Sequence, residues 1–162
     1  MTLYMAEFST LISKLRATWD DHLQPDEASG AVVVGAEHIR DVCAFLQSDP
    51  DCYFDMLSCL TGLDNGPEAG TMEVIYNLYS IPFHHHLMLR VIVPRDNPEV
   101  PSVSSVYRTA NWHEREAFDL YGIRFTGHPD LRRILLPADW EGYPLRKDYR
   151  HQEYYRGVKV EY

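Results

Sequence analysis

Hydrophobic residues recur every three or four positions in two stretches of the chain, a spacing that is typical of amphipathic helices. The first stretch covers residues 3 to about 19, and its apolar positions are Met5, Phe8, Ile12, Leu15 and Trp19. The second runs from Ile39 to Leu46 and is followed by Ser48-Asp49-Pro50, a sequence that stops helices. We therefore predict two helices that each bury one face.

Other stretches indicate strands. A short β-branched run, Ala31 to Val34, follows the polar segment from Asp20 to Gly30. Three further candidates follow one another, and apolar and polar residues alternate clearly in the second and third of them: Tyr53 to Thr61, Thr71 to Ser80, and His85 to Val93. Their short connections favour antiparallel pairing between neighbours.

A third helix is expected after the proline-containing segment that ends at Pro101. It should begin near Val103, and Asn111 with Glu114 has the spacing of a capping box and offers a fresh start. Gly122 is the expected stop. The order of elements predicts an α+β fold: a two-layer domain with helices on one face of a mixed, mainly antiparallel sheet.

The last part of the chain shows neither the helical spacing of three or four residues nor the alternation of a strand. Residues 128–162 contain three prolines, five of the eleven tyrosines and a tryptophan. Such a segment buries little core by itself, whereas Tyr, Trp and Arg commonly anchor interfaces. Within a single domain we therefore expect an α+β body, residues 1–122, and an extended, irregular C-terminal arm, residues 123–162, that docks on a neighbouring protein.

Charge narrows the class of protein. The chain of 162 residues has a formal net charge of −9, which argues against binding to nucleic acid because phosphates would be repelled. The acidity is uneven, since residues 1–128 hold 18 acidic and 8 basic residues and residues 129–162 hold 6 and 7. No window approaches the ~20 apolar residues that cross a bilayer, so any membrane association is expected to be indirect, through partners.

The residues that could bind metal do not form a recognisable motif. The three cysteines lack the two-residue spacing usual in zinc and iron–sulfur sites, and we expect reduced thiols at Cys43, Cys52 and Cys59. Adjacent strand residues point to opposite faces, so we interpret His84-His85-His86 as surface imidazoles. The sequence also lacks a Gly-x-Ser-x-Gly motif, a phosphate-binding glycine loop and a dinucleotide fingerprint. We predict no catalytic, cofactor-binding or metal-binding residue.

Two motifs lie close together near the end. In the first, Glu114-Arg115-Glu116 is followed by Asp119, then by Leu120-Tyr121, by His128 and by Arg132-Arg133-Ile134-Leu135-Leu136. In the second, residues 141–149 read Glu-Gly-Tyr-Pro-Leu-Arg-Lys-Asp-Tyr. Together they resemble the shared motifs of the C-subunit family of NADH-quinone oxidoreductase, respiratory complex I.

The resemblance implies a non-catalytic structural component of a proton-translocating, multi-subunit oxidoreductase. In that family the protein belongs to the hydrophilic arm of the complex and packs against the D subunit at the quinone site, peripheral to the plasma membrane on its cytoplasmic side. The resemblance also implies that this chain holds no cofactor and that flavin and iron–sulfur clusters belong to partner subunits. An alternative remains, because both motifs also fit the equivalent component of a related membrane-bound hydrogenase or ferredoxin-driven photosynthetic complex.

Roles of single residues are predicted only at the level of assembly. For Glu114, Arg115, Glu116 and Asp119 we favour an ion-pair network that fixes the direction in which the arm leaves the body. The structural signature is expected at Glu114, Arg115, Glu116, Asp119, His128 and Arg132. The partner interface is expected at Arg132, Arg133, Leu135, Leu136, Trp140, Tyr143, Arg146, Lys147 and Tyr149, where the basic groups would contact carboxylates or carbonyls of the neighbour.

Overall fold

The computed structural model describes residues 2–26 and 29–160, with side chains from residue 9 onward. At its centre is a five-stranded sheet with the order β1-β2-β5-β4-β3. The strands are β1 (Leu23–Asp26), β2 (Ala31–Val34), β3 (Met56–Gly66), β4 (Thr71–Ser80) and β5 (His85–Pro94). Neighbouring strands pair antiparallel except β2 and β5, which are parallel. The predicted mixed, mainly antiparallel sheet is confirmed.

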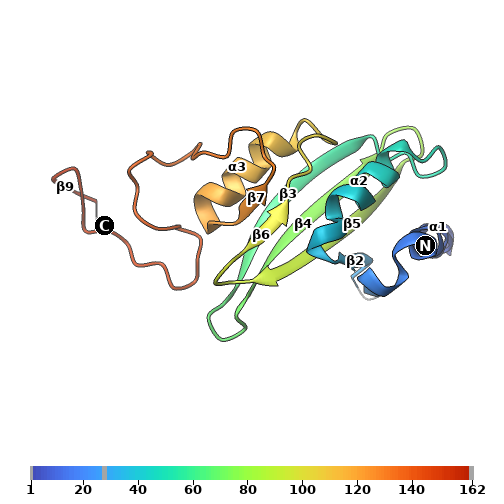
Figure 1. Ribbon diagram of the computed structural model, residues 1–162, viewed down its shortest axis with the longest axis horizontal. Helices are drawn as coiled ribbons and strands as arrows, with labels where there is room; N and C mark the ends of the chain where they lie inside the picture. Colours follow the sequence, from blue (N-terminus) through green and yellow to red (C-terminus); the bar gives the residue numbers. More distant parts are fainter. Residues whose placement is uncertain (1, 27–28, 161–162) are drawn as a thin grey trace.

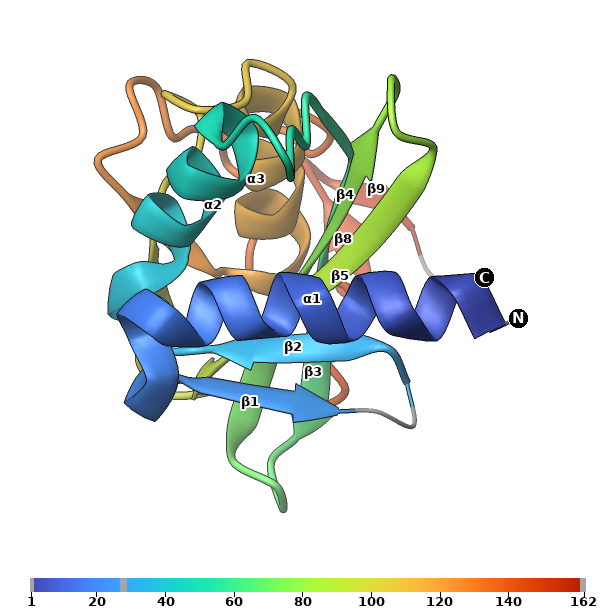
Figure 2. The same cartoon turned by 90° about the vertical axis from the view of Figure 1, so that its right-hand side faces the viewer.

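The described residues form three α-helices, α1 (Thr2–Trp19), α2 (Ile39–Ser48) and α3 (Ala110–Tyr121), which lie against one face of the sheet (Figure 1, Figure 2). Alternate residues of the central strands point to that face and are buried, for example Met72, Val74, Tyr76 and Leu78 of β4. They form one core with the apolar sides of α1 and α2. The opposite face is more exposed, which gives the expected two layers. No helix in the described part of the chain has the length and apolar character needed to span a membrane.

Two predicted boundaries are wrong. β3 begins at Met56 rather than Tyr53 and continues to Gly66, because the reversal into β4 is made by residues 67–70. No helix begins near Val103 in the described structure, where residues 104–109 form turns and α3 starts at Ala110. No side chain among the described residues caps the first turn of α3, so the capping box does not form.

Several short elements lie outside the predicted ones. β1 occupies part of the polar segment between the first helix and β2. The 3-10 turn η1 (Asp20–His22) precedes β1, and a second 3-10 turn, η2 (Ala36–His38), follows β2. β6 (Glu99–Pro101) and β7 (Arg124–Thr126) form a parallel pair next to α3.

The pairing of β7 adds Ile123 and Phe125 to the core, so the packed body includes residues beyond 122. The predicted stop of α3 at Gly122 is confirmed, since this residue has a left-handed φ of 77°. Residues 127–153, all of them described, contain neither helix nor strand and lead to a small hairpin, β8 (Tyr154–Tyr155) and β9 (Val158–Lys159). This arm lies at the end of the molecule opposite α1 (Figure 1).

Candidate functional site

Asp119, fully buried near the end of α3, fixes the first part of the arm. Its Oδ2 accepts the backbone N–H groups of Ile134, Leu135 and Leu136 at 2.9, 2.7 and 2.9 Å. Its Oδ1 pairs with Nη1 of Arg133 at 2.7 Å. Burial alone would raise the pKa of Asp119, but the hydrogen bond from Leu136, the Arg133 pair and the other two N–H groups outweigh it and lower this pKa. The carboxylate is therefore charged in the folded protein.

Arg133 uses its guanidinium inside the chain. Besides the Asp119 carboxylate, Nη1 donates to the Asp119 carbonyl at 2.9 Å, and Nη2 donates to the carbonyls of Trp140 at 3.1 Å and Gly142 at 2.9 Å. The guanidinium carbon also lies 5.3 Å from the ring centroid of Tyr143. This side chain joins two separate parts of the arm to α3.

Arg115 makes a second link between α3 and the arm. Its Nε donates to the carbonyl of Arg132 at 3.2 Å and its Nη2 to that of Arg133 at 3.4 Å, while its guanidinium lies over the ring of Trp112. Glu116 is exposed. Of the four residues expected to form an ion-pair network, Arg115 and Asp119 thus contact the arm, and the ion pair of Asp119 is with Arg133 of the arm and not with Arg115.

Glu114 points the other way, into the body. It is fully buried, and its carboxyl group accepts the N–H of Val103 at 2.7 Å and the hydroxyl of Ser102 at 2.6 Å. Burial raises the pKa of Glu114 to about 7 in spite of these two hydrogen bonds. Glu114 therefore holds the segment before α3 in place.

His128 closes the turn at which the arm begins. The N–H of Asp130 donates to its Nδ1 at 3.0 Å, and its Nε2 lies 3.1 Å from the carbonyl of Asn111. These contacts fit the tautomer with the proton on Nε2. The same nitrogen is 3.9 Å from the Glu114 carboxylate, which is too far for a hydrogen bond.

A second buried carboxylate, Asp64 of β3, holds the arm further along, and nothing in the sequence pattern had singled it out. Oδ1 accepts Nε of Arg95 at 2.8 Å and the N–H of Gly66 at 2.9 Å, and Oδ2 accepts the N–H of Lys147 at 2.8 Å. Arg95 also pairs with Asp148. The hydrogen bond from Arg95 is the main reason that the pKa of Asp64 falls to about 2.

Several residues predicted for the partner interface pack against one another. Nε of Arg146 donates to the carbonyl of Tyr121 at 2.6 Å, and its guanidinium lies 4.7 Å from the ring centroid of Tyr143. Nε1 of Trp140 donates to the hydroxyl of Tyr149 at 3.1 Å. These contacts give the irregular segment a fixed shape. Tyr143, Arg146 and Tyr149 also line an open cavity of about 390 Å³ in the arm.

Other side chains of the arm face outward. Leu135 and Leu145 are 61% and 48% exposed, and Tyr154 and Val158 are 60% and 65% exposed. Arg132 is also exposed and pairs with the nearby Asp130 at 2.9 Å. The arm thus combines buried charged groups that hold it to the body with apolar groups on its outside.

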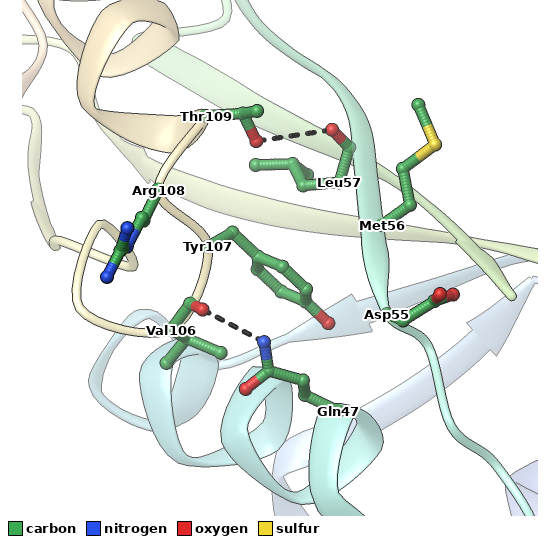
Figure 3. Close-up of a pocket in the computed structure, with 8 residues that line it drawn as sticks. All are labelled: Gln47, Asp55, Met56, Leu57, Val106, Tyr107, Arg108 and Thr109. Carbon is green, nitrogen blue, oxygen red and sulfur yellow. Dashed lines mark hydrogen bonds between the residues drawn. The ribbon is translucent and has the colours of Figure 1, made fainter.

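A separate cavity of about 330 Å³ lies between α2, the start of β3 and the loop before α3 (Figure 3). Nε2 of Gln47 donates to the carbonyl of Val106 at 2.9 Å, and the hydroxyl of Thr109 donates to the carbonyl of Leu57 at 3.4 Å (Figure 3). Tyr107 is buried beside them. The polar groups of this cavity fasten the loop to the body.

The cysteines and the histidine run do not gather into a site. Burial raises the pKa of the Cys52 thiol to about 12 and that of the Cys43 thiol even further, so both stay protonated. His84 contacts the hydroxyl of Tyr79 at 3.3 Å. His85, however, is buried with a ring nitrogen 2.9 Å from the carbonyl of Cys52, so the prediction of a surface imidazole is wrong for this residue. As the first residue of β5 it faces the core, where it packs on an aromatic ring.

Known proteins are similar to this chain in sequence. The profile of the family described as the respiratory-chain NADH dehydrogenase 30 Kd subunit matches residues 32–155. The C subunit of NADH-quinone oxidoreductase from Chlorobium phaeobacteroides is 46% identical over 80% of this chain and 78% of that protein. The one from Trichlorobacter lovleyi is 42% identical over 90% of this chain and 91% of its own length. The chain spans only half the length of another relative, from Chloroherpeton thalassium, which is 49% identical over 75% of this chain.

Two solved structures resemble the chain. A trypsin-resistant fragment (1-134) of Nqo5 superposes with a TM-score of 0.60 and 28% identity, over 75% of this chain and 99% of the fragment. A chain of an archaeal respiratory membrane complex, the membrane-bound sulfane sulfur reductase, gives a TM-score of 0.73 at 22% identity, over 89% of this chain and 86% of that one. This second likeness shows the fold.

Proposed function

Because the chain belongs to the family of the 30 kDa subunit of respiratory-chain NADH dehydrogenase, we propose that it is a non-catalytic structural component of a proton-translocating NADH-quinone oxidoreductase. Its arm docks on the D subunit at the quinone site and supports the transfer of electrons from NADH to quinone. The chain itself holds no redox centre, and flavin and iron–sulfur clusters belong to partner subunits. It is peripheral to the membrane, on the cytoplasmic side, and is held there by the complex.

The observation that supports docking most directly is the combination of anchoring and exposure in the arm. Asp119 and Asp64 hold it to the body through backbone N–H groups, so its path is fixed although it has no regular structure over most of its length. Leu135 and Leu145 nevertheless face outward. A surface that is already ordered loses less conformational entropy when it binds, and exposed apolar side chains gain from burial.

The contacts divide the predicted interface residues into two groups. Arg133 and Arg146 donate to carbonyls and a carboxylate of their own chain, so their part in assembly is to shape the arm. Leu135 and Arg132 remain on the outside, and with the exposed Leu145 they are the groups that we assign to the partner contact. Only a minority of interface side chains cost more than about 1 kcal/mol when they are truncated, and the few that cost about 2 kcal/mol or more lie near the centre of the interface.

The thiols support the proposal that this chain carries no redox centre. Metals and iron–sulfur clusters bind thiolates, whereas Cys43 and Cys52 are buried with raised pKa values. Binding at either position would require both deprotonation and a rearrangement of the core. This favours other subunits as the carriers of electrons.

Recovery of the tagged chain from solubilised membranes, with mass spectrometry of its partners, tests the proposal. We expect a chain of the D-subunit type together with flavin and iron–sulfur subunits. Leu135→Glu and Leu145→Glu should each lower this recovery about tenfold or more, since each places a charge in the interface. Ile81→Glu is the matched control, because Ile81 is 53% exposed on the loop between β4 and β5.

Each other outcome has a clear meaning. Recovery of a nickel hydrogenase chain would show that this protein belongs to the related hydrogenase and not to the NADH-linked complex. Recovery of no partner would overturn the structural role. Equal recovery with all three variants would leave the family role in place but would remove the arm from the interface.

A further inference from the structure

Three potential metal ligands meet where η1 leads into β1 and η2 leads into α2. This is the end of the β1–β2 pair that lies on the left in Figure 2. Nδ1 of His22 lies 3.7 Å from Oε1 of Glu37, and Nε2 of His38 lies 3.5 Å from the same oxygen. All three ligand atoms lie within 4.8 Å of one another, and the centroids of the two imidazole rings are 4.1 Å apart. The ligands come from segments that are separated by the whole β1–β2 hairpin.

The backbone around Gly35 holds these side chains together. Its N–H donates to the carbonyl of His22 at 3.1 Å, and the N–H of His38 donates to the carbonyl of Gly35 at 3.0 Å. The Glu37 carboxylate lies directly over Gly35, where a Cβ atom would be only 2.9 Å from Oε1. The hairpin thus fixes the spacing of the two turns, and the absence of a side chain at position 35 leaves room for the carboxylate.

The geometry is close to that of a zinc site. In a tetrahedral site with bonds of about 2.0–2.1 Å, neighbouring ligand atoms are separated by about 3.3 Å. The Glu37 oxygen lies 3.7 and 3.5 Å from the two nitrogens, a few tenths of an ångström beyond this, and all three atoms lie within 4.8 Å of one another, so rotation of the exposed side chains brings the set to bonding distance. Two imidazoles and one carboxylate are a usual ligand set for this ion, with water at the remaining position.

The surroundings allow a cation to enter. The side chains of His22 and His38 are 48% and 27% exposed. Asp20 and Asp21 precede His22 directly and add negative charge, which attracts a divalent cation. The ligands lie on η1 and η2, far from the arm that we propose to dock on the partner.

We propose that Nδ1 of His22, Oε1 of Glu37 and Nε2 of His38 bind one divalent ion of the zinc class. Bound there, the ion joins the start of β1 to the start of α2 and stabilises that corner of the sheet. Zinc has no redox chemistry, so the site adds no electron carrier to the chain.

Calorimetric titration of the full chain with zinc chloride tests this site, with protein that lacks a polyhistidine tag and has been treated with a chelator. We expect one ion per chain, and a melting temperature that rises with zinc. Cobalt in place of zinc should give the visible absorption of a four-coordinate site. His22→Ala and His38→Ala should each weaken binding by about 100-fold or more, because loss of a mere outer-shell partner already costs about 10- to 100-fold.

His151→Ala is the control, since His151 is exposed in the arm and should leave zinc affinity and the zinc-dependent rise in melting temperature unchanged. Circular dichroism without metal verifies that the variants fold, and Glu37→Gln gives an independent test that retains both imidazoles. Failure to bind one equivalent of zinc would overturn the proposal. So would equal binding by the wild type, His22→Ala and His38→Ala, because the ion would then be held elsewhere.

Discussion

Two fully buried carboxyl groups on the same helix differ in charge because their neighbours differ. Asp119 accepts three backbone N–H groups and pairs with Arg133, and its pKa is lowered. Glu114 receives only one N–H and one hydroxyl, and burial raises its pKa to about 7. Desolvation therefore prevails at Glu114 and is overcome at Asp119. The spacing in the sequence, which places both on one helix, does not distinguish them.

Glu114 should make the stability of the fold depend on pH. Its pKa is about 7 when folded and about 4.5 ordinarily, so the folded state retains a proton that the unfolded state releases. The contribution of this group is full below pH 4.5 and is lost as the pH rises to about 7, a loss of about 2–3 kcal/mol. Glu114→Gln should remove this loss, since its amide oxygen can still accept the Val103 N–H and its amide nitrogen can donate to the Ser102 oxygen. Urea unfolding at pH 5 and pH 8 measures it, and an equal change in both proteins would contradict the assignment.

Individual residues of the site could be identified from the sequence, but the sequence does not show which groups their side chains contact. Asp119 and Arg133 stand in the first of the two sequence motifs, yet an arginine in a sequence can point to its own chain or to a partner. Asp64 and Lys147 are 83 positions apart, and nothing in their spacing indicates contact. His22 and Glu37 meet for the same reason, through a hairpin whose first strand was not predicted.

At the scale of elements, the end of α3 is where body and arm meet. Gly122 adopts a left-handed φ of 77°, which ends the helix. The arm then returns over this residue, since a Cβ atom at position 122 would lie 2.6 Å from the Tyr143 ring and 2.7 Å from the Arg146 guanidinium. Gly122 is needed both for the turn and for this close approach.

Comparison of two glycine variants separates the cost of the left-handed backbone conformation from the cost of the close approach of the arm. Gly127 has a similar φ of 80°, but a Cβ atom there would meet nothing within 4 Å. Gly127→Ala should therefore cost only the backbone strain, about 1–2 kcal/mol. Gly122→Ala should cost about 1–3 kcal/mol more, because Tyr143 and Arg146 must move. Chemical unfolding measures both, and equal costs would show that the arm does not rest on Gly122.

Long elements were predictable because their periodicity repeats several times. α2, β4 and β5 appear where the sequence placed them, whereas β1, β6 and β7 have only three or four residues each. So few residues cannot show a period, and these strands exist because a partner strand lies beside them. The helix expected near Val103 does not form in the described structure, where the Ser102 hydroxyl and the Val103 N–H donate to Glu114 of the following helix.

Across the whole molecule, the bonds that hold the arm become weaker with distance from the body. Residues 134–136 and Lys147 of the arm are held to the body by the buried carboxylates of Asp119 and Asp64. The last part of the arm is held mainly by exposed contacts, such as the pair of Asp139 with Arg156 at 2.8 Å. Exposed pairs contribute about 0–1 kcal/mol, so we expect local opening to begin at the far end of the arm.

Limited digestion with trypsin measures this gradient in the free protein. We expect the first cuts after Arg150 and Arg156 and slower cuts after Arg132 and Arg133, because the latter peptides lie next to the N–H groups bound by Asp119. Asp119→Asn turns an acceptor into a donor, and it should speed cleavage after Arg132 and Arg133 about tenfold or more, since charged hydrogen bonds contribute about 1.5–3 kcal/mol each.

Asp139→Asn is the matched control for that digestion, as it removes an exposed carboxylate at which the arm is not anchored to the body. It should leave the cuts after Arg132 and Arg133 at the wild-type rate. If the wild type were cut there first, the arm would not be held in the free protein, and its order would depend on the partner alone. If it were cut there last and Asp119→Asn changed nothing, the three N–H bonds would not be what holds it. The body orders the arm before the proposed partner binds only if three results occur together. The wild type is cut slowly after Arg132 and Arg133, Asp119→Asn speeds these cuts, and Asp139→Asn leaves them unchanged.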